Sequence, residues 1–248
     1  MDNSLTYYTV ASVIEAFILW LYCNKLFKQR LNTPLSILIA IIMHLLSAPV
    51  YMLHFPILNI ISFILITYIV TIIISDISFF SAIFHSLMLT VVMGLSELLV
   101  VGFVPNLYIL FFRESGTINN TALYVFISKT IYLFISQAVS TILKKRKGSY
   151  PYSDRSTLFL SIIPATSIII MLCLCFICIS IPLTSKVNAY SSVSILLLLA
   201  INMFTFYMQQ IIVRKNNEMP AFYLNYNANR IMYSITILSK TIIINSGY

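Results

Sequence analysis

Residues 57–74 read ILNIISFILITYIVTIII and contain no charged side chain. A helix rises about 1.5 Å per residue, so this run nearly crosses the roughly 30 Å hydrocarbon core of a bilayer. Similar apolar runs recur along the chain. Together the runs occupy residues 5–23, 35–53, 57–74, 81–104, 121–143, 156–181 and 193–213. The sequence therefore predicts an all-α, polytopic transmembrane helix bundle of about seven spans, with six spans as the main alternative.

The composition agrees with a membrane protein. Hydrophobic residues make up 60% of the 248 residues and charged residues only 9%, with a mean hydropathy of +0.95, whereas about 25% of residues in soluble domains are charged. The formal net charge of +8 does not indicate nucleic acid, because the cations stand in short blocks beside apolar runs. We therefore expect membrane lipid as a partner, no nucleic acid, and a multi-pass location in the plasma membrane.

The cations lie on alternate sides of the predicted spans. They follow the first, fifth and seventh runs, at Lys25, Lys28, Arg30, residues 144–147, Arg155, Arg214 and Lys215. The loops on the opposite side hold only Arg113 and Lys186. Because cytoplasmic loops carry the excess of Lys and Arg, the N-terminus is predicted outside and the C-terminus inside. The turn at residues 75–80 carries no cation and is the weakest part of this topology.

Two further apolar features leave alternatives open. Residues 107–112 form an aromatic, apolar run beyond the fourth predicted span. This run is a re-entrant lip, a docking surface for a hydrophobic ligand, or a continuation of that span. The cysteines, Cys23 and the group Cys173, Cys175 and Cys178, lie in or beside lipid. Their spacing lacks paired zinc knuckles, so we interpret them as apolar packing rather than as a disulfide or metal site.

Four ionisable residues within the apolar runs form the candidate site. Glu97 and Lys129 lie at similar depth from the outer ends of adjacent antiparallel spans, so they are predicted to pair. Glu15 and His44 fall near the same layer. The cluster is either a polar floor beneath an outward-facing cavity, where a ligand shifts the pairing between helices, or a satisfied structural cluster that fixes helix order.

Other polar side chains are interpreted as structural. Neighbouring polar residues are candidates to satisfy the charged layer, namely Asn59, Tyr68, Ser96, Ser128, Tyr132 and Gln137, although most of them are expected simply to pack between helices. Asn202 and Gln209 lie seven residues apart and share a helix face. They predict a polar seam toward another helix or a partner subunit.

No pattern in the sequence predicts an enzyme active site. The chain has neither a glycine-rich phosphate loop nor an HExxH or GxSxG motif, and only five glycines. The depth of Cys23 differs from that of His44 and His54, which argues against a Cys–His dyad. We therefore predict no catalytic residue, no metal ligand and no cofactor.

Polar residues are sparse on the predicted helices, but the short motifs that contain them form a distinctive pattern. The motifs are Ile14-Glu15-Ala16, LYCNKLF at 21–27, Leu58-Asn59, SAIFHSL at 81–87, LSEL at 95–98, Ser128-Lys129, and Gln209-Gln210 before RKNNE at 214–218. With these residues the chain resembles the membrane sensor region of Gram-positive sensor histidine kinases with GHKL-type ATPase domains, the group that includes AgrC-like pheromone receptors. The similarity covers roughly residues 5–225.

The resemblance implies a receptor module of a two-component, quorum-sensing type of system. Such a module senses an extracellular peptide or small ligand and passes a helix movement inward, acting as a homodimer or with a partner receptor. The phosphoacceptor and ATPase motifs of such kinases are not found, so we expect a sensor-like domain at 1–213 and a short cytoplasmic tail at 214–248, as in a truncated or frame-shifted receptor. The alternative function is a small transport component that binds substrate for an energising partner.

Overall fold

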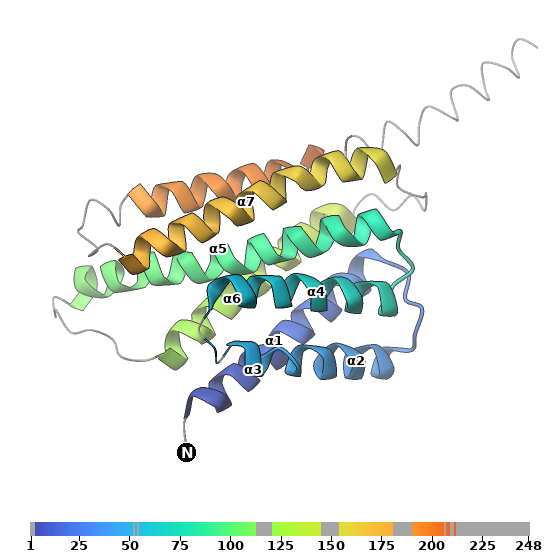
Figure 1. Ribbon diagram of the computed structural model, residues 1–248, viewed down its shortest axis with the longest axis horizontal. Helices are drawn as coiled ribbons and strands as arrows, with labels where there is room; N and C mark the ends of the chain where they lie inside the picture. The colour runs from blue at the N-terminus through green and yellow to red at the C-terminus, as the bar shows by residue number, and fades with distance from the viewer. Residues whose placement is uncertain are drawn as a thin grey trace, which may run out of the picture. The chain divides into compact units, whose positions relative to one another are not determined.

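The computed structural model describes residues 3–51, 53, 55–112, 121–144, 154–180, 190–205, 207–208 and 211. The labelled helices are α1 (Asn3–Leu26), α2 (Thr33–Leu45), α3 (Ala48–Tyr51), α4 (Pro56–Ile74), α5 (Phe79–Phe112), α6 (Thr121–Lys144) and α7 (Asp154–Ser180) (Figure 1). Contacts divide the chain into a unit Met1–Tyr207 and a unit Met208–Tyr248. All that follows concerns the first unit, because only Met208 and Ile211 of the second are described.

The predicted all-α bundle is confirmed. Six stretches are long and apolar enough to cross a membrane: Thr6–Leu26, Thr33–Tyr51, Pro56–Ile74, Phe79–Val101, Leu123–Thr141 and Phe159–Phe176. The described part of the seventh predicted run, Tyr190–Thr205, is a shorter apolar helix. The chain is therefore a multi-pass helical membrane protein with at least six candidate spans, whereas its orientation in the bilayer stays a prediction.

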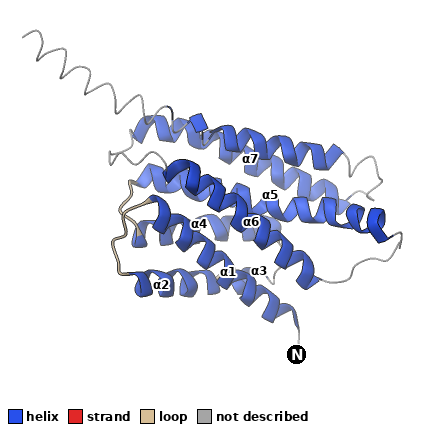
Figure 2. Cartoon of the chain, turned by 180° about the vertical axis from the view of Figure 1, so that it is seen from behind, coloured by secondary structure: helices blue, strands red, loops and turns tan. Residues whose placement is uncertain are grey.

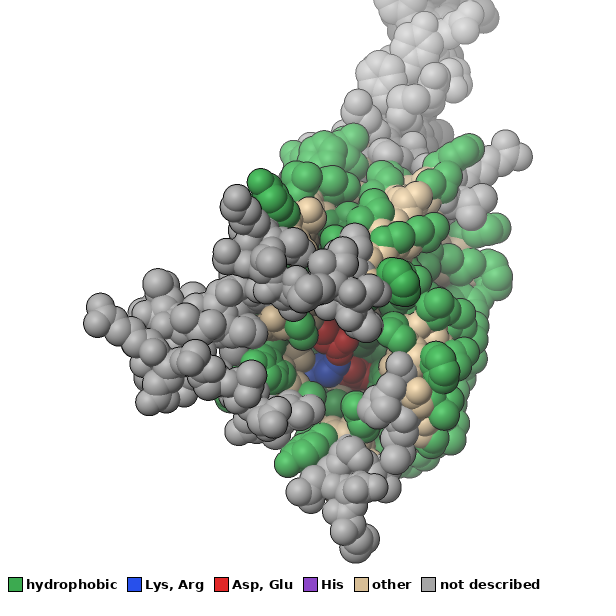
Figure 3. All heavy atoms as spheres, turned by 60° about the vertical axis from the view of Figure 1, so that its left-hand side comes forward, with side chains coloured by type: hydrophobic (Ala, Val, Ile, Leu, Met, Phe, Trp, Pro, Cys, Tyr) green, Lys and Arg blue, Asp and Glu red, His purple; other side chains and the backbone are tan. Residues whose placement is uncertain are grey.

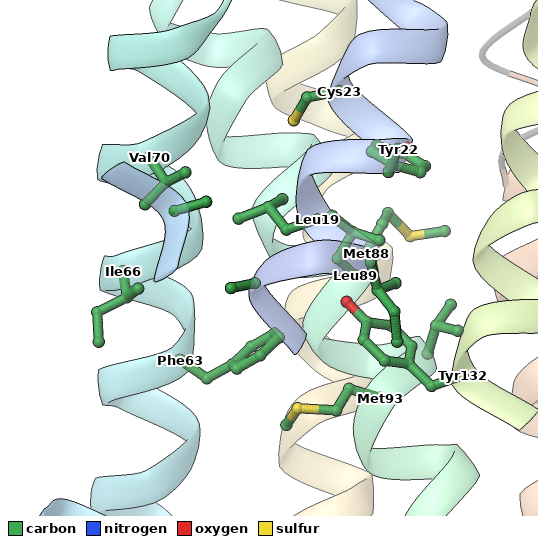
Figure 4. Close-up of a cluster of buried hydrophobic side chains, with 14 of the residues drawn as sticks. Leu19, Tyr22, Cys23, Phe63, Ile66, Val70, Met88, Leu89, Met93 and Tyr132 are labelled. Atoms are coloured by element: carbon green, nitrogen blue, oxygen red, sulfur yellow. The ribbon is translucent and has the colours of Figure 1, made fainter. Parts of the chain in front are cut away.

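α5 is the central helix of the bundle. Its apolar window is 78% buried, and it packs against α4, α6 and α7, while α1 packs against α2 and α6. One apolar core gathers side chains from α1, α4, α5 and α6, among them Leu19, Phe63, Met88 and Tyr132 (Figure 4). A second core joins α5 and α7 to the helix Tyr190–Thr205. Apolar packing on several sides explains why α5 carries hydrophobic residues around its whole circumference.

The second predicted span is present as one candidate membrane stretch, Thr33–Tyr51, but its helix is interrupted. α2 ends at Leu45 and α3 begins at Ala48. Pro49 has no backbone N–H to give to the carbonyl of Leu45, so the helical hydrogen-bond ladder cannot continue there. Instead the Ser47 hydroxyl donates to the carbonyl of His44 at 2.5 Å. This break lies between His44 and Tyr51, two side chains of the candidate site.

Residues 107–112 belong to α5, whose backbone is helical to Phe112. The continuation of the fourth span is therefore the correct alternative, and the re-entrant lip is wrong. The following residues, 113–120, lie outside the described part of the chain, as do His54, Gln209 and the predicted tail at 214–248.

The loops at the C-terminal ends of α1 and α4 clasp one another. Gln29 pairs with Ser75 in an antiparallel bridge, flanked by backbone bonds from Arg30 N to Ile74 O at 2.9 Å and from Asp76 N to Lys28 O at 2.8 Å. The Arg30 guanidinium also lies 3.3 Å from the Asp76 carboxylate. We call these contacts the clasp; Figure 2 shows the two loops side by side.

Lys25 ties the end of α1 to α6. Its ammonium donates to the Thr141 hydroxyl at 2.5 Å and to Oε1 of Gln137 at 3.3 Å. Gln137 therefore serves Lys25 and not the charged layer where it was expected. The cations of the first loop and the C-terminal end of α6 thus lie at one end of the bundle, an arrangement that the positive-inside pattern requires.

Candidate functional site

Three helices each contribute one charged side chain to a single contact. The Lys129 ammonium on α6 lies 2.5 Å from Oε1 of Glu15 on α1 and 2.6 Å from Oε1 of Glu97 on α5. The predicted pairing of Glu97 with Lys129 is therefore present. Glu15, expected only in the same layer, joins the pair directly. We call these residues, with Tyr51 and His44 described below, the charged cluster.

The three charges differ in their exposure. The side chains of Glu15 and Lys129 are 2% and 5% exposed, whereas that of Glu97 is 49% exposed. Figure 3 shows basic and acidic side chains reaching the surface within a frame of hydrophobic side chains. Because ionised groups in hydrocarbon are costly unless paired, Lys129 and Glu15 form the buried half of the cluster. Glu97 is the exposed half.

Tyr51 completes the bonding of Glu15. Its hydroxyl donates to Oε2 of Glu15 at 2.9 Å, so both carboxylate oxygens of Glu15 have a donor. Tyr51 comes from α3, just beyond the break at Ser47. Tyr51 was not among the predicted site residues, because the break between α2 and α3 separates it from the helix that carries His44.

His44 lies beside the ion pairs but is not hydrogen-bonded to them. Nδ1 lies 3.0 Å from the carbonyl oxygen of Ala40. A carbonyl can only accept, so Nδ1 carries the proton and Nε2 presents a lone pair when the ring is neutral. The ring is fully buried, stands edge to face on Phe63 at 5.9 Å, and interacts electrostatically with Glu15 and Lys129.

Two buried polar atoms near the cluster have no partner in the described part of the chain. Nε2 of His44 is one, and the hydroxyl oxygen of Tyr132 is the other. Tyr132 lies three residues after Lys129 on α6, hence on the same face, and its ring stands 6.5 Å from that of Phe63. A buried polar atom without a partner costs about 1–3 kcal/mol, so each such atom calls for a water molecule or a ligand.

Serines beside the cluster bond within their own helices. The hydroxyl of Ser96 donates to the Val92 carbonyl at 2.7 Å, and that of Ser128 to the Val125 carbonyl at 2.9 Å. These two serines therefore do not satisfy the charged residues, which agrees with the interpretation that most such groups pack between helices. A serine in a helix surrounded by apolar groups reaches the carbonyl three or four residues earlier more easily than any side chain on another helix.

Other buried polar contacts join helices away from the charged cluster. The Tyr22 hydroxyl and Nδ1 of His85 lie 2.7 Å apart, which links α1 to α5. Nδ2 of Asn202 donates to the Ser167 hydroxyl at 2.8 Å, so Asn202 takes part in a polar seam with another helix, as predicted. Among the described residues, no group of three His, Cys, Asp or Glu side chains stands close enough to hold a metal ion.

Comparison with protein-family models, with curated proteins and with solved structures finds no match. The resemblance to AgrC-like sensor regions therefore stays a prediction, carried by the residues quoted for it. What the geometry establishes is a helical membrane bundle whose charged residues join α1, α3, α5 and α6 at one place.

Proposed function

We propose that this bundle is the input module of a membrane receptor, which senses an extracellular peptide or small ligand in the manner of AgrC-like sensor kinases. The observation that carries the proposal is the sharing of Lys129 between a buried acid, Glu15, and a half-exposed acid, Glu97. In this arrangement one ammonium contacts two carboxylates at once. A ligand that engages Glu97 removes one of its two partners.

The helix positions give this exchange a mechanical consequence. Glu15 and Lys129 hold α1 against α6, while Glu97 and Lys129 hold α5 against α6. α1 is fixed to α6 a second time by Lys25, which follows Glu15 by ten residues on α1 and contacts Gln137 and Thr141, eight and twelve residues after Lys129 on α6. Loss of the Glu97 contact therefore removes the ion pair between α5 and α6, while the contacts of Lys129 and Lys25 still hold α1 against α6. Ligand binding acts by differential affinity for these two states.

The experiment is a distance measurement between spin labels in lipid nanodiscs. The natural cysteines are replaced, and labels are placed at the exposed positions Val101 on α5, Phe134 on α6 and Phe17 on α1. Peptide fractions of culture fluid from the source cells are then added. We expect an active fraction to change the distance from 101 to 134 and to leave the distance from 17 to 134 unchanged. If no fraction changes either distance, the proposal is wrong.

One observation favours a second function, that of a substrate-binding transport subunit. The break between α2 and α3 lies beside the charged cluster, and α3 supplies Tyr51 to it. Interrupted helices at polar residues are typical of transporter substrate sites. Uptake that depends on the chain should then be lost in the double variant Glu97→Gln with Lys129→Met. Uptake that persists unchanged in that variant would remove this alternative.

A further inference from the structure

The charged cluster holds more negative than positive charge. Glu15 and Glu97 contribute two carboxylates, and Lys129 contributes the single ammonium that lies between them. With both carboxylates ionised, the three side chains have a formal charge of −1. Both oxygens of Glu15 already accept, one from Lys129 and one from Tyr51. The unmatched negative charge therefore falls on Glu97.

Glu97 has unused capacity to accept hydrogen bonds. Only its Oε1 contacts Lys129, and no donor in the described part of the chain lies on Oε2. Glu97 is also the exposed member of the cluster, since 49% of its side chain is accessible. A carboxylate offers about four lone-pair positions, so Oε2 of Glu97 can accept from a ligand before the contact between Oε1 and Lys129 is given up.

His44 supplies an independent observation at the same place. Its ring is fully buried, Nδ1 donates to the Ala40 carbonyl, and Nε2 has no partner among the described residues. The nearest charges to this ring include Glu15 and Lys129. A neutral His44 therefore presents another acceptor beside the carboxylates. Every open position described at the cluster, apart from the hydroxyl of Tyr132, is an acceptor without a donor.

We infer that the group recognised at this cluster is a cation with N–H donors, an ammonium or a guanidinium, which binds Glu97 in competition with Lys129. The inference rests on the proposed function and names the chemistry of its ligand. Such a group supplies the missing positive charge and the missing donors at once, whereas a neutral hydroxyl supplies only a donor. Charge-assisted bonds of this kind are about twice as strong as neutral ones.

An anionic ligand fits the geometry poorly. Lys129, the cation that would receive it, is 5% exposed and already lies between two carboxylates. An anion that approaches from the accessible side meets Glu97 first and is repelled. A cation meets its partner first and needs no prior opening of the buried pair between Glu15 and Lys129.

Calorimetric titration of the protein in nanodiscs tests this inference with four probes. Methylguanidinium and propylammonium are cations with N–H donors, tetramethylammonium is a cation without them, and propionate is an anion. We expect saturable binding of the first two, at least tenfold weaker binding of tetramethylammonium, and no binding of propionate. Glu97→Gln should weaken binding of the donor cations at least tenfold, because it removes the charge but keeps the size of the side chain.

Two variants separate recognition from folding. Asp76→Asn neutralises another acid that is exposed and paired, in this case with Arg30. Asp76 lies in the clasp, just before α5 begins, and Glu97 lies about 27 Å from that end of α5 at 1.5 Å per residue. Asp76→Asn should leave binding unchanged. Lys129→Met should strengthen binding of methylguanidinium, since the competing ammonium is gone. If this variant does not fold, binding by Glu97→Gln still tests the inference, because that variant keeps the buried pair between Lys129 and Glu15 and is expected to fold.

Three results would overturn the inference: propionate bound more tightly than methylguanidinium, equal binding of tetramethylammonium, or no saturable binding of any probe. Binding that survives Glu97→Gln would do the same. These failures differ from failure of the proposed function. A culture fraction that changes the distance from 101 to 134 but is not displaced by methylguanidinium would refute the cationic group alone and leave the receptor proposal standing.

Discussion

Lys129 is the residue on which the charged cluster depends. Its ammonium is the shared partner of Glu15 and Glu97, and only 5% of its side chain is exposed. Lys129→Met therefore leaves Glu15 buried with Tyr51 as its one described donor. We expect the free energy of unfolding to fall by about 3–5 kcal/mol, measured by titration of micelles with sodium dodecyl sulfate. Arg30→Gln, which removes an exposed pair, should cost only about 0–1 kcal/mol. Equal stability of the Lys129 variant and the wild type would contradict this account.

Substitution of Tyr51 is a smaller change at the same site. Tyr51→Phe removes the hydroxyl that donates to Oε2 of Glu15 and keeps the ring. A hydrogen bond to a charged group contributes about 1.5–3 kcal/mol, so we expect a loss of that size in the same unfolding titration. Tyr68→Phe, in the middle of α4, is the matched control and should be nearly neutral. If Tyr51→Phe leaves the free energy of unfolding unchanged, Tyr51 does not belong to the cluster.

At this scale the sequence predicted part of the site. Equal depth in antiparallel helices was enough to pair Glu97 with Lys129, since the rise per residue of a helix is fixed. Depth alone could not show that Glu15 turns toward Lys129, because that depends on how α1 is rotated about its own axis. Tyr51 was missed because its position depends on the break in the second span.

The clasp tests the arrangement of elements without any ligand. Opposed residues of an antiparallel bridge have Cα atoms about 4.5–5.5 Å apart, within the range of about 4.4–6.8 Å that a disulfide requires. Gln29→Cys with Ser75→Cys, in a chain without its natural cysteines, should therefore cross-link under mild oxidation. The product is detected by its faster migration in a non-reducing gel. Gln29→Cys with Ser86→Cys, one pair member moved into α5, should not cross-link; the reverse pattern would refute the clasp.

Close packing of α5 on α7 gives a second test of the elements. A side chain at Gly94 would collide with the end of the Met171 side chain, so Gly94→Leu overfills the contact and should cost about 1–3 kcal/mol. Met171→Ala makes room, so the double variant should lose less stability than the sum of the two single changes. Strict additivity of the two losses would show that α5 and α7 do not meet at Gly94.

The helices themselves were predictable, because a bilayer requires long runs without charge and leaves few alternatives to a helix. The interruption at Ser47 was not, since an apolar run through Pro49 still has the length and composition of a single span. Pro49 was the available clue. The sequence also could not decide whether residues 107–112 continue the fourth span, because an apolar run beyond a span is as compatible with a re-entrant segment as with a longer helix.

The whole molecule makes a prediction about orientation. Lys25, Lys28 and Arg30 lie at the end of the bundle that carries the clasp, and the positive-inside rule places that end in the cytoplasm. A cysteine introduced at Lys28 should react with a membrane-impermeant maleimide only after cells are permeabilised. One introduced at the exposed position Phe55, at the other end of α4, should react in intact cells. Reaction of the first in intact cells would invert the topology.

The central claim is that Glu97 is the ligand-binding side of a cluster whose other side holds the helices together. The most direct measurement is binding of an active culture-fluid fraction to wild type and Glu97→Gln in lipid nanodiscs, with unfolding measured on the same samples. We predict that binding falls at least tenfold while stability changes by only about 1 kcal/mol, the size expected for a half-exposed pair. Undiminished binding by Glu97→Gln, or loss of its fold, would show that the cluster is a structural lock and not a receptor site.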